Sequence, residues 1–235
     1  MLKAYNPKSA ANDDVMRPSS STGERPHGAF ASTQLMVPIR SIGPSQRPRI
    51  IEHLVRLNSD DRYLRFGYAA TDEQIANYVA HIDFERDDVF GIYNRKLELI
   101  ATAHLALADR DGFESCAEFG VSVAHRARGR GYGTRLFERA VMHARNEGRQ
   151  LLFIQALSEN ATMLSIARRA GAVVERFGAD SEAYLRLPRA SFDSRLSEAV
   201  YQGFAETDYR LKEQAKRFHD MVFALRRAEP GGRVL

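Results

Sequence analysis

The chain has 235 residues, of which 44% are hydrophobic and 27% charged, a composition typical of a folded protein rather than a disordered one. No stretch reaches the roughly 20 consecutive apolar residues that span a bilayer, and the first residues lack the apolar core of a secretory signal, so we expect a cytoplasmic protein with no membrane partner. The formal net charge of +4 is too small to predict a nucleic-acid partner, and the single cysteine, Cys116, excludes an internal disulfide and a cysteine-based metal cluster.

The N-terminal part of the chain changes character near Thr33. Residues 1–32 are rich in Ser, Pro and Gly and have no apolar periodicity, which predicts a disordered polar tail. The segment Thr33–Arg40 has strand character. Helical periodicity then predicts helices at 48–58, 59–66 and 71–82. Thr71 and Gln74 form a capping-box pattern at the start of the third of these helices.

From residue 89 onward, predicted strands and helices follow one another closely. Alternating or continuous apolar residues predict strands at 89–96, 97–110, 114–124, 151–157, 172–177 and 182–187. Helical periodicity predicts one helix at 134–148 and another that begins near Asn160 and ends at Gly171. This order predicts an α+β (α/β) fold in which helices flank a mixed central sheet.

A long helix is expected near the C-terminal end. Residues 191–227 contain no proline and only one glycine, Gly203. Apolar residues recur at every seventh position: Phe204, Leu211, Phe218 and Leu225. The helix either packs back on the preceding domain or pairs with a second copy, although Thr207 and Gln214 interrupt the second seam position of a coiled coil. The pattern permits a homodimer without requiring one.

A glycine-rich turn lies between a predicted strand that ends near Ala124 and a predicted helix that begins near Thr134. Gly129, Gly131 and Gly133 allow a tight turn, and the free amides at a helix N-terminus form a ready site for pyrophosphate. The turn lacks the GK[ST] ending of a nucleoside triphosphate loop and the G-x-G-x-x-G spacing of dinucleotide folds. We therefore expect a phosphorylated cofactor other than ATP or NAD.

The same turn carries a wider pattern. Arg128, Gly131 and Gly133 form R-x-x-G-x-G after a strand, within the run VSVAHRARGRGYGTRL, and LLFIQALSENATMLSIARRAGA follows. This pattern resembles the GNAT acetyltransferase superfamily. DDRYLRF and AEFGVSV are similar to the GNAT domains of bacterial protein-lysine acetyltransferases that modify acyl-CoA synthetases. The resemblance implies a mostly antiparallel sheet in a domain at 33–188, and it leaves a helical extension at 189–235.

The resemblance also implies an activity and a site. The enzyme would transfer acetyl from acetyl-CoA to a primary amine, with a protein lysine ahead of a small amine. Glu118 matches the catalytic glutamate of the similar protein acetyltransferases and is the expected general base. Backbone amides would hold the pantetheine arm and the pyrophosphate. The implied cofactor-binding residues are Val121, Val123, Arg128, Gly129, Arg130, Gly131, Gly133, Thr134 and Asn160.

Several alternatives stay open at this point. His104 and His125 are alternative bases, and Ala167 stands where many GNAT enzymes carry an acidic tyrosine, so the sequence does not identify a general acid. Residues 56–82 are expected to form part of the acceptor wall. The seven histidines show no metal-ligand spacing, so no metal is expected. The alternative function is a non-catalytic, regulatory acetyl-CoA-binding domain whose C-terminal helix binds a partner.

Overall fold

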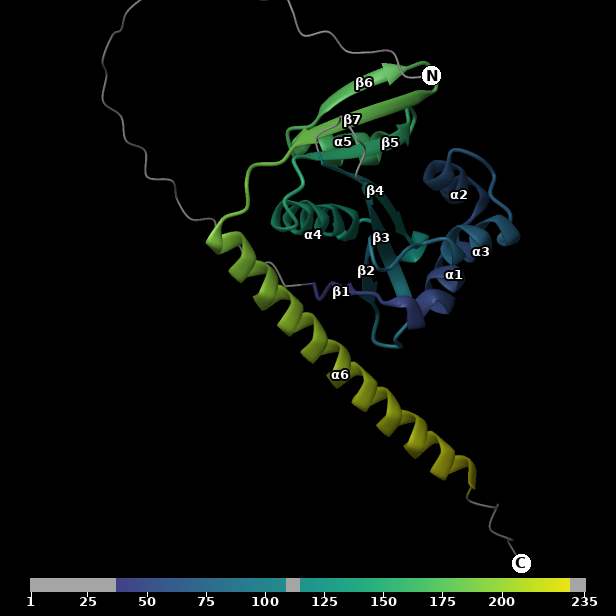
Figure 1. The fold of residues 1–235 in the computed structure, drawn as a ribbon. Helices are drawn as coiled ribbons and strands as arrows, with labels where there is room; N and C mark the ends of the chain where they lie inside the picture. Colours follow the sequence, from purple (N-terminus) through teal and green to yellow (C-terminus); the bar gives the residue numbers. More distant parts are fainter. Residues whose placement is uncertain (1–36, 109–114, 229–235) are drawn as a thin grey trace, which may run out of the picture. The chain divides into compact units, whose positions relative to one another are not determined.

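A computed structural model describes residues 37–108 and 115–228, so the tail predicted at 1–32 lies outside the described residues. In the described part, one seven-stranded sheet has the order β1-β2-β3-β4-β5-β7-β6 (Figure 1). The strands are β1 (Arg40–Ser41), β2 (Asp88–Tyr93), β3 (Leu99–Ala108), β4 (Cys116–Val123), β5 (Leu151–Leu157), β6 (Val173–Phe177) and β7 (Asp180–Arg186). Neighbouring strands are antiparallel except β4 and β5, which confirms the predicted mixed, mostly antiparallel sheet.

Strand β1 is shorter than the sequence predicts. Of the segment Thr33–Arg40, residues 33–36 lie outside the described residues, and the strand predicted over 37–39 is wrong. Strand β1 begins only at Arg40, which is opposite Gly91 of β2. Pro38 explains the late start, because proline has no amide hydrogen to donate to a strand ladder.

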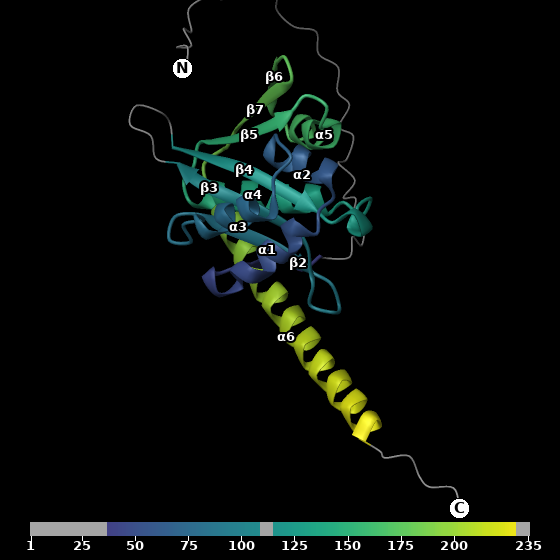
Figure 2. The same cartoon turned by 90° about the vertical axis from the view of Figure 1, so that its right-hand side faces the viewer.

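Helices cover both faces of the sheet. The described helices are α1 (Arg47–Val55), α2 (Ser59–Phe66), α3 (Asp72–Ala80), α4 (Tyr132–Asn146), α5 (Ala161–Arg169) and α6 (Phe192–Ala228), with 3-10 turns at Pro44–Gln46 and His125–Ala127. Figures 1 and 2 show α1, α2 and α3 together on one side of the central strands and α4 on the other. No helix in the described ranges is long and apolar enough to cross a membrane.

The two faces of the sheet bury separate apolar clusters, which fixes the direction of the side chains on β4. Phe119 of β4 packs edge-on against Phe137 of α4, with ring centroids 5.1 Å apart. Successive side chains of a strand point to opposite faces. Glu118, Gly120 and Ser122 therefore face the side of α1, α2 and α3. The predicted catalytic residue lies on the face opposite to α4.

Local sequence explains the ends of the helices near the site. The side chain of Asn58 caps α2 by accepting a hydrogen bond from the amide of Asp61 at 2.8 Å. Thr71 and Gln74 form both bonds of the predicted capping box at the start of α3, which confirms it. Gly67 closes α2 in the left-handed conformation, with φ of +80°. Helix α2 is therefore a short element with fixed ends.

The first turns of α6 pack back on the sheet domain. Glu198 accepts hydrogen bonds from Arg139 and His143 of α4, each at 2.5 Å. Further along α6, Glu206 forms an ion pair with Arg40 of β1 at 3.0 Å. Of the two arrangements that the heptad pattern left open, packing back is therefore present in the described part of this helix.

Candidate active site

Strands β4 and β5 separate in the middle of the sheet. They pair only over Cys116–Glu118 and Leu151–Phe153, although β4 continues to Val123 and β5 to Leu157. The parallel pair therefore opens beyond Glu118. This gap is where the family resemblance expects the cofactor to enter.

The edge of β4 that faces the gap presents backbone N–H groups. The amide of Ala124 donates to the carbonyl of Ile100 on β3 at 2.9 Å. Because amides along an antiparallel strand alternate in direction, those of Val121 and Val123 point away from β3 and toward the gap. A buried amide needs an acceptor, and a bound ligand can supply one here. Both residues are among those predicted to hold the pantetheine arm.

The glycine-rich turn leads into a helix N-terminus that has no side-chain cap. Gly129 and Gly131 both have φ of +74°, a conformation that glycine adopts without strain. Gly131 is the N-cap of α4, which begins at Tyr132, and it makes no capping bond through a side chain. Side chains do cap α2, α3 and α5. The first amides of α4, from Tyr132 to Thr134, thus remain available to an anion, which the helix dipole also favours.

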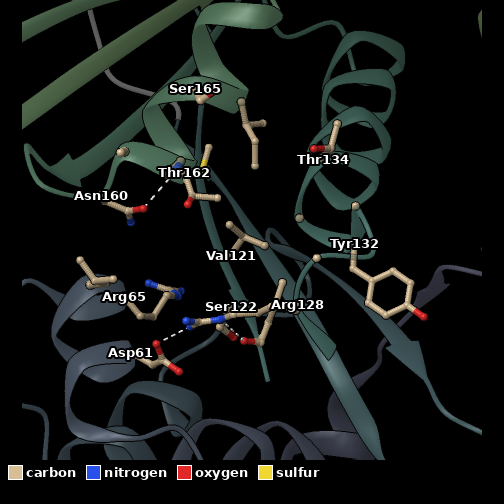
Figure 3. Close-up of a pocket in the computed structure, with 18 of the residues that line it drawn as sticks. Asp61, Arg65, Val121, Ser122, Arg128, Tyr132, Thr134, Asn160, Thr162 and Ser165 are labelled. Carbon is tan, nitrogen blue, oxygen red and sulfur yellow. Dashed lines mark hydrogen bonds and ion pairs between the residues drawn. The ribbon is translucent and has the colours of Figure 1, made fainter. Parts of the chain in front are cut away.

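A cavity of about 710 Å³, called the cofactor cavity below, lies between α2, β4, the glycine turn and α5 (Figure 3). Its volume is within the roughly 300 to 1,000 Å³ of typical ligand sites. The cavity brings together all but one of the predicted cofactor-binding residues: Val121, Val123, Arg128, Gly129, Gly131, Gly133, Thr134 and Asn160. Arg130 is the exception, because it is exposed and does not line the cavity.

The cofactor cavity has an excess of positive charge. Its charged lining residues are Asp61, Arg65, Arg128 and Arg169. Arg169 donates to the hydroxyl of Thr134 at 3.3 Å, and Arg128 forms an ion pair with Asp61 (Figure 3). The Asp61 side chain is 4% exposed, and its Oδ2 atom has no hydrogen-bond partner among the described residues. Three guanidinium groups against one carboxylate suit a polyanionic cofactor, and a phosphate would compete with Asp61 for Arg128.

A smaller hollow of about 230 Å³, called the acceptor hollow below, adjoins the cofactor cavity. The two share the lining residues Leu64, Arg65, Val121, Asn160 and Met163. Glu118 lines the acceptor hollow from β4, and Asp180 lines it from the start of β7. Glu118 is exposed, and its side chain has no hydrogen bond or ion pair with another described residue. Its carboxylate is therefore open to an incoming group, as a general base must be.

Helix α2 and its flanks supply the wall that the sequence placed within 56–82. From this range the acceptor hollow is lined by Leu64, Arg65, Phe66 and Gly67, whereas Leu57 and Asp61 line only the cofactor cavity. Residues 68–82 line neither. Sequence reasoning did not identify Asp61 and Arg65 as the charged residues that α2 presents to the two cavities. The available signal was the segment DDRYLRF, which contains both.

Neither of the two alternative histidine bases faces these cavities. His104 is held between the hydroxyl of Tyr78, at 2.7 Å, and the carboxylate of Asp87, at 3.0 Å. Burial lowers the pKa of His104, and the hydrogen bond to Asp87 offsets this only in part. His125 is exposed in a 3-10 turn and lines neither cavity. Within the described residues, no group of three or more His, Cys, Asp and Glu side chains could hold a metal ion.

A third histidine, which the sequence did not single out, lies beneath the cofactor cavity. His53 of α1 is within 3.0 Å of the carbonyl of Leu99 through Nδ1 and within 2.8 Å of the Ser122 hydroxyl through Nε2. Because the carbonyl can only accept, Nδ1 carries the proton and Ser122 donates to Nε2. Burial lowers the pKa of His53 to about 4, so the ring is neutral near pH 7. The pair ties α1 to β3 and β4 without adding charge to the site.

Helix α5 contributes polar groups to the cofactor cavity. Asn160 accepts a hydrogen bond from the amide of Met163 at 3.1 Å, so it caps α5 and lines both cavities at once. Thr162 and Ser165 present hydroxyl side chains along the same wall (Figure 3). Ala167 is fully buried in the core under the helix. Ala167, the position at which many GNAT enzymes carry a tyrosine, therefore faces away from the cavity.

Comparison with known proteins finds similarity to acetyltransferase domains. A family model described as an acetyltransferase (GNAT) domain matches residues 45–173. The GNAT domain of PAT from S. lividans has a TM-score of 0.54 at 20% identity, and the match covers 63% of this chain and 89% of that one. An acetyltransferase of the GNAT family from Streptococcus pneumoniae has a TM-score of 0.52 at 14% identity, covering 63% and 98%. Spermidine N-acetyltransferase from Vibrio cholerae, in complex with CoA and spermine, has a TM-score of 0.50 at 17% identity, covering 64% and 95%.

Proposed function

The chain belongs to the GNAT acetyltransferase family and is an acetyl-CoA-dependent N-acetyltransferase, and from this premise we propose that it acetylates a primary amine, preferably of a protein lysine, in the acceptor hollow. The observation that carries the proposal is the position of Glu118. It places an open carboxylate in a hollow that adjoins the cofactor cavity and shares part of its wall.

The cofactor cavity has the groups that acetyl-CoA requires. Acetyl-CoA supplies the acetyl group as an activated thioester. Arg128 and the first amides of α4, from Tyr132 to Thr134, bind the pyrophosphate. The amides of Val121 and Val123 hold the pantetheine arm and donate to the acetyl carbonyl. Oxyanion donors of this kind are worth roughly 3 to 4 kcal/mol each in other enzymes.

Glu118 acts as the general base. An acceptor amine of the lysine type has a pKa near 10.4 and must lose a proton before it can attack. The carboxylate of Glu118 accepts that proton, directly or through a water molecule. Asp180 adds a second negative charge that attracts the ammonium form into the hollow. The departing thiolate is a tolerable leaving group, and solvent can return its proton without a dedicated side chain.

The dimensions of the acceptor hollow favour a lysine of a protein. At about 230 Å³ it is smaller than the sites that enclose a whole drug-sized molecule, which begin at roughly 300 Å³. The hollow therefore suits the end of a long side chain. Leu64, Phe66 and Met163 supply apolar surface for an aliphatic stem, and Glu118 is exposed to an approaching peptide. The similarity of DDRYLRF and AEFGVSV to protein-lysine acetyltransferases supports the same choice.

Thiol release from acetyl-CoA with lysine-containing peptides tests this function. We expect Glu118→Gln to bind acetyl-CoA like the wild type and to lose roughly 100-fold or more in kcat, with the largest loss at low pH, where the amine is most protonated. Glu175→Gln is the matched control, because Glu175 is exposed on β6 and lines neither cavity. Equal turnover of both variants at every pH would remove Glu118 from the mechanism. Tight binding of acetyl-CoA without turnover of any amine would refute the proposed acceptor.

We also propose that the chain divides into a catalytic domain at 33–188 and an extension at 189–235, and that α6 of this extension has a role in self-association. The face of α6 opposite to the one that packs on the sheet domain carries an exposed apolar stripe. The stripe consists of Leu196, Val200, Phe204 and Leu211, which are 55%, 59%, 38% and 61% exposed. The spacing of this stripe follows one side of a helix. Self-association of two copies through the stripe would bury it, which is the basis for proposing a homodimer.

A further inference from the structure

One arginine in the acceptor hollow has no acidic partner. Arg65 of α2 is half-buried and lines both the acceptor hollow and the cofactor cavity. Its guanidinium donates one hydrogen bond, to the neutral hydroxyl of Tyr78 at 2.7 Å. No carboxylate of the described residues is within ion-pair distance of it, although Asp61, one turn earlier on α2, does pair with Arg128. A half-buried guanidinium without a counter-ion is well suited to bind an anion from outside.

A directed chain of hydrogen bonds holds this guanidinium in place. His104 is neutral because burial lowers its pKa. Its Nε2–H donates to Asp87 at 3.0 Å, and its Nδ1 accepts from the hydroxyl of Tyr78 at 2.7 Å. The oxygen of Tyr78 is then left to accept from Arg65. Each hydrogen bond in the chain has one direction, so the hydroxyl oxygen of Tyr78 is an acceptor oriented for the guanidinium.

Strand β4 also makes room for the guanidinium. A Cβ atom added at Gly120 would lie 2.7 Å from Nη2 of Arg65 and 2.8 Å from its Cζ. The side chain therefore lies directly on the strand backbone, one residue from Val121 and on the face that carries Glu118. Arg65 is therefore near the amide of Val121, which is proposed to donate to the acetyl carbonyl. The amides of Tyr132–Thr134, which suit the pyrophosphate, belong to a different element, α4.

We propose that the acceptor carries a carboxylate in addition to its reactive amine and that Arg65 binds this carboxylate. The inference rests on the proposed function and defines its substrate class. The charged lining of the acceptor hollow consists of Glu118, Asp180 and Arg65, which is complementary to a molecule with both an ammonium and a carboxylate group. Two sources share this chemistry: a lysine flanked by an acidic residue in a peptide, and a free amino acid.

Two matched pairs of acceptors distinguish these sources. The first pair is a peptide with Lys next to Asp and the same peptide with Asn in place of that Asp. The second pair is free lysine and lysinamide, which differ in the carboxylate. The readout is the ratio of kcat/KM within each pair, because effects on folding, cofactor binding and the chemical step cancel in this ratio. We expect the wild type to favour the carboxylate member of one pair by about tenfold or more, the usual size of a charged hydrogen bond.

Variants of the arginine and of its support complete the test. Arg65→Gln should bring the ratio close to one, and Arg65→Lys should give an intermediate ratio because it keeps charge without the planar fork. Tyr78→Phe removes the hydroxyl that positions Arg65 and should lower the ratio in part. Loss of the preference in Arg65→Gln supports the proposal, and the pair that shows it identifies the source.

The remaining outcomes overturn the inference in distinguishable ways. A wild type that uses both members of each pair equally well has no carboxylate site, and the proposed acetyltransfer to amines stands. A preference that Arg65→Gln retains assigns the carboxylate to another residue. If none of the four acceptors is turned over while acetyl-CoA binds, both the inference and the proposed acceptor fail.

Discussion

The substitution Gly131→Asp, compared with Gly131→Asn, probes the charge of the cofactor cavity. Gly131 lines the cavity at the N-cap of α4, and nothing lies within 4 Å of the Cβ atom that a side chain would add. Its φ of +74° lies in a region that Asp and Asn tolerate better than other residues do. Asp and Asn at this position share their size and backbone strain, so a larger loss of cofactor affinity with Asp than with Asn isolates the electrostatic part.

The size of the loss follows from Coulomb's law. Two unit charges about 4 Å apart interact by about 1 kcal/mol in water and by about 4 kcal/mol at an effective dielectric constant of about 20. An aspartate next to the roughly two charges of a pyrophosphate should thus cost at least about 2 kcal/mol, or about 30-fold in Kd. Salt should reduce this loss, because the turn is open to solvent.

Calorimetric titration with acetyl-CoA at low and high salt measures the effect. Gly131→Asn is the matched control, because it has the same size and the same backbone strain without the charge. We expect the Asn variant to bind far more tightly than the Asp variant, and the difference to shrink at high salt. Wild-type affinity in Gly131→Asp, or an equal loss in both variants, would refute the electrostatic assignment of the turn.

Two further predictions concern α6. The stability of the protein should fall as the pH rises from about 6.5 through about 9. Burial alone would lower the pKa of His143, but its hydrogen bonds to Asp88 and Glu198 have a larger effect and raise the pKa to about 9. The raised pKa stabilises the folded protein by on the order of 3 kcal/mol. This contribution is fully present below a pH of about 6.5, the ordinary pKa of histidine, and is lost as the pH rises through about 9. Thermal unfolding of the wild type and His143→Gln measures it, and the same pH slope in both would contradict this account. The second prediction is that Val200→Glu converts a dimer to a monomer, as measured by sedimentation velocity. Gln202→Glu is the control, because residue 202 lies off the stripe, and it should leave the dimer intact. A wild type that is monomeric at every concentration would refute self-association.

Local patterns predicted two features near the site: the glycine turn between a strand and a helix, and Asn160 at the start of the next helix. The role of Glu118 as a base and that of Asn160 in cofactor binding were expected through the family resemblance. The amides of Val121 and Val123 were also expected only through the family resemblance, because they are left without a strand partner only where β4 separates from β5. Local periodicity carries no information about where two paired strands part.

The charged residues of α2 could not be found in this way, because their partners are far away in sequence. Asp61 pairs with Arg128 of the glycine turn, and Arg65 lies against Gly120 of β4. The pattern DDRYLRF predicts a helix and places it in the acceptor wall, but it does not show which of its charges turn inward. Only packing of α2 on β4 decides that, since an exposed helix face would have the same composition.

The arrangement of charge across the two cavities explains how one short helix can serve both substrates. The cofactor cavity has three guanidinium groups and one carboxylate, whereas the acceptor hollow has two carboxylates and one guanidinium. A polyanionic cofactor is therefore drawn to one side, and a cationic amine to the other. Arg65 belongs to both linings, at the border where the sign of the charge changes. A carboxylate on the acceptor would pair there with the one cation that the acceptor hollow contains, which would position the amine between Glu118 and the reacting end of the cofactor cavity.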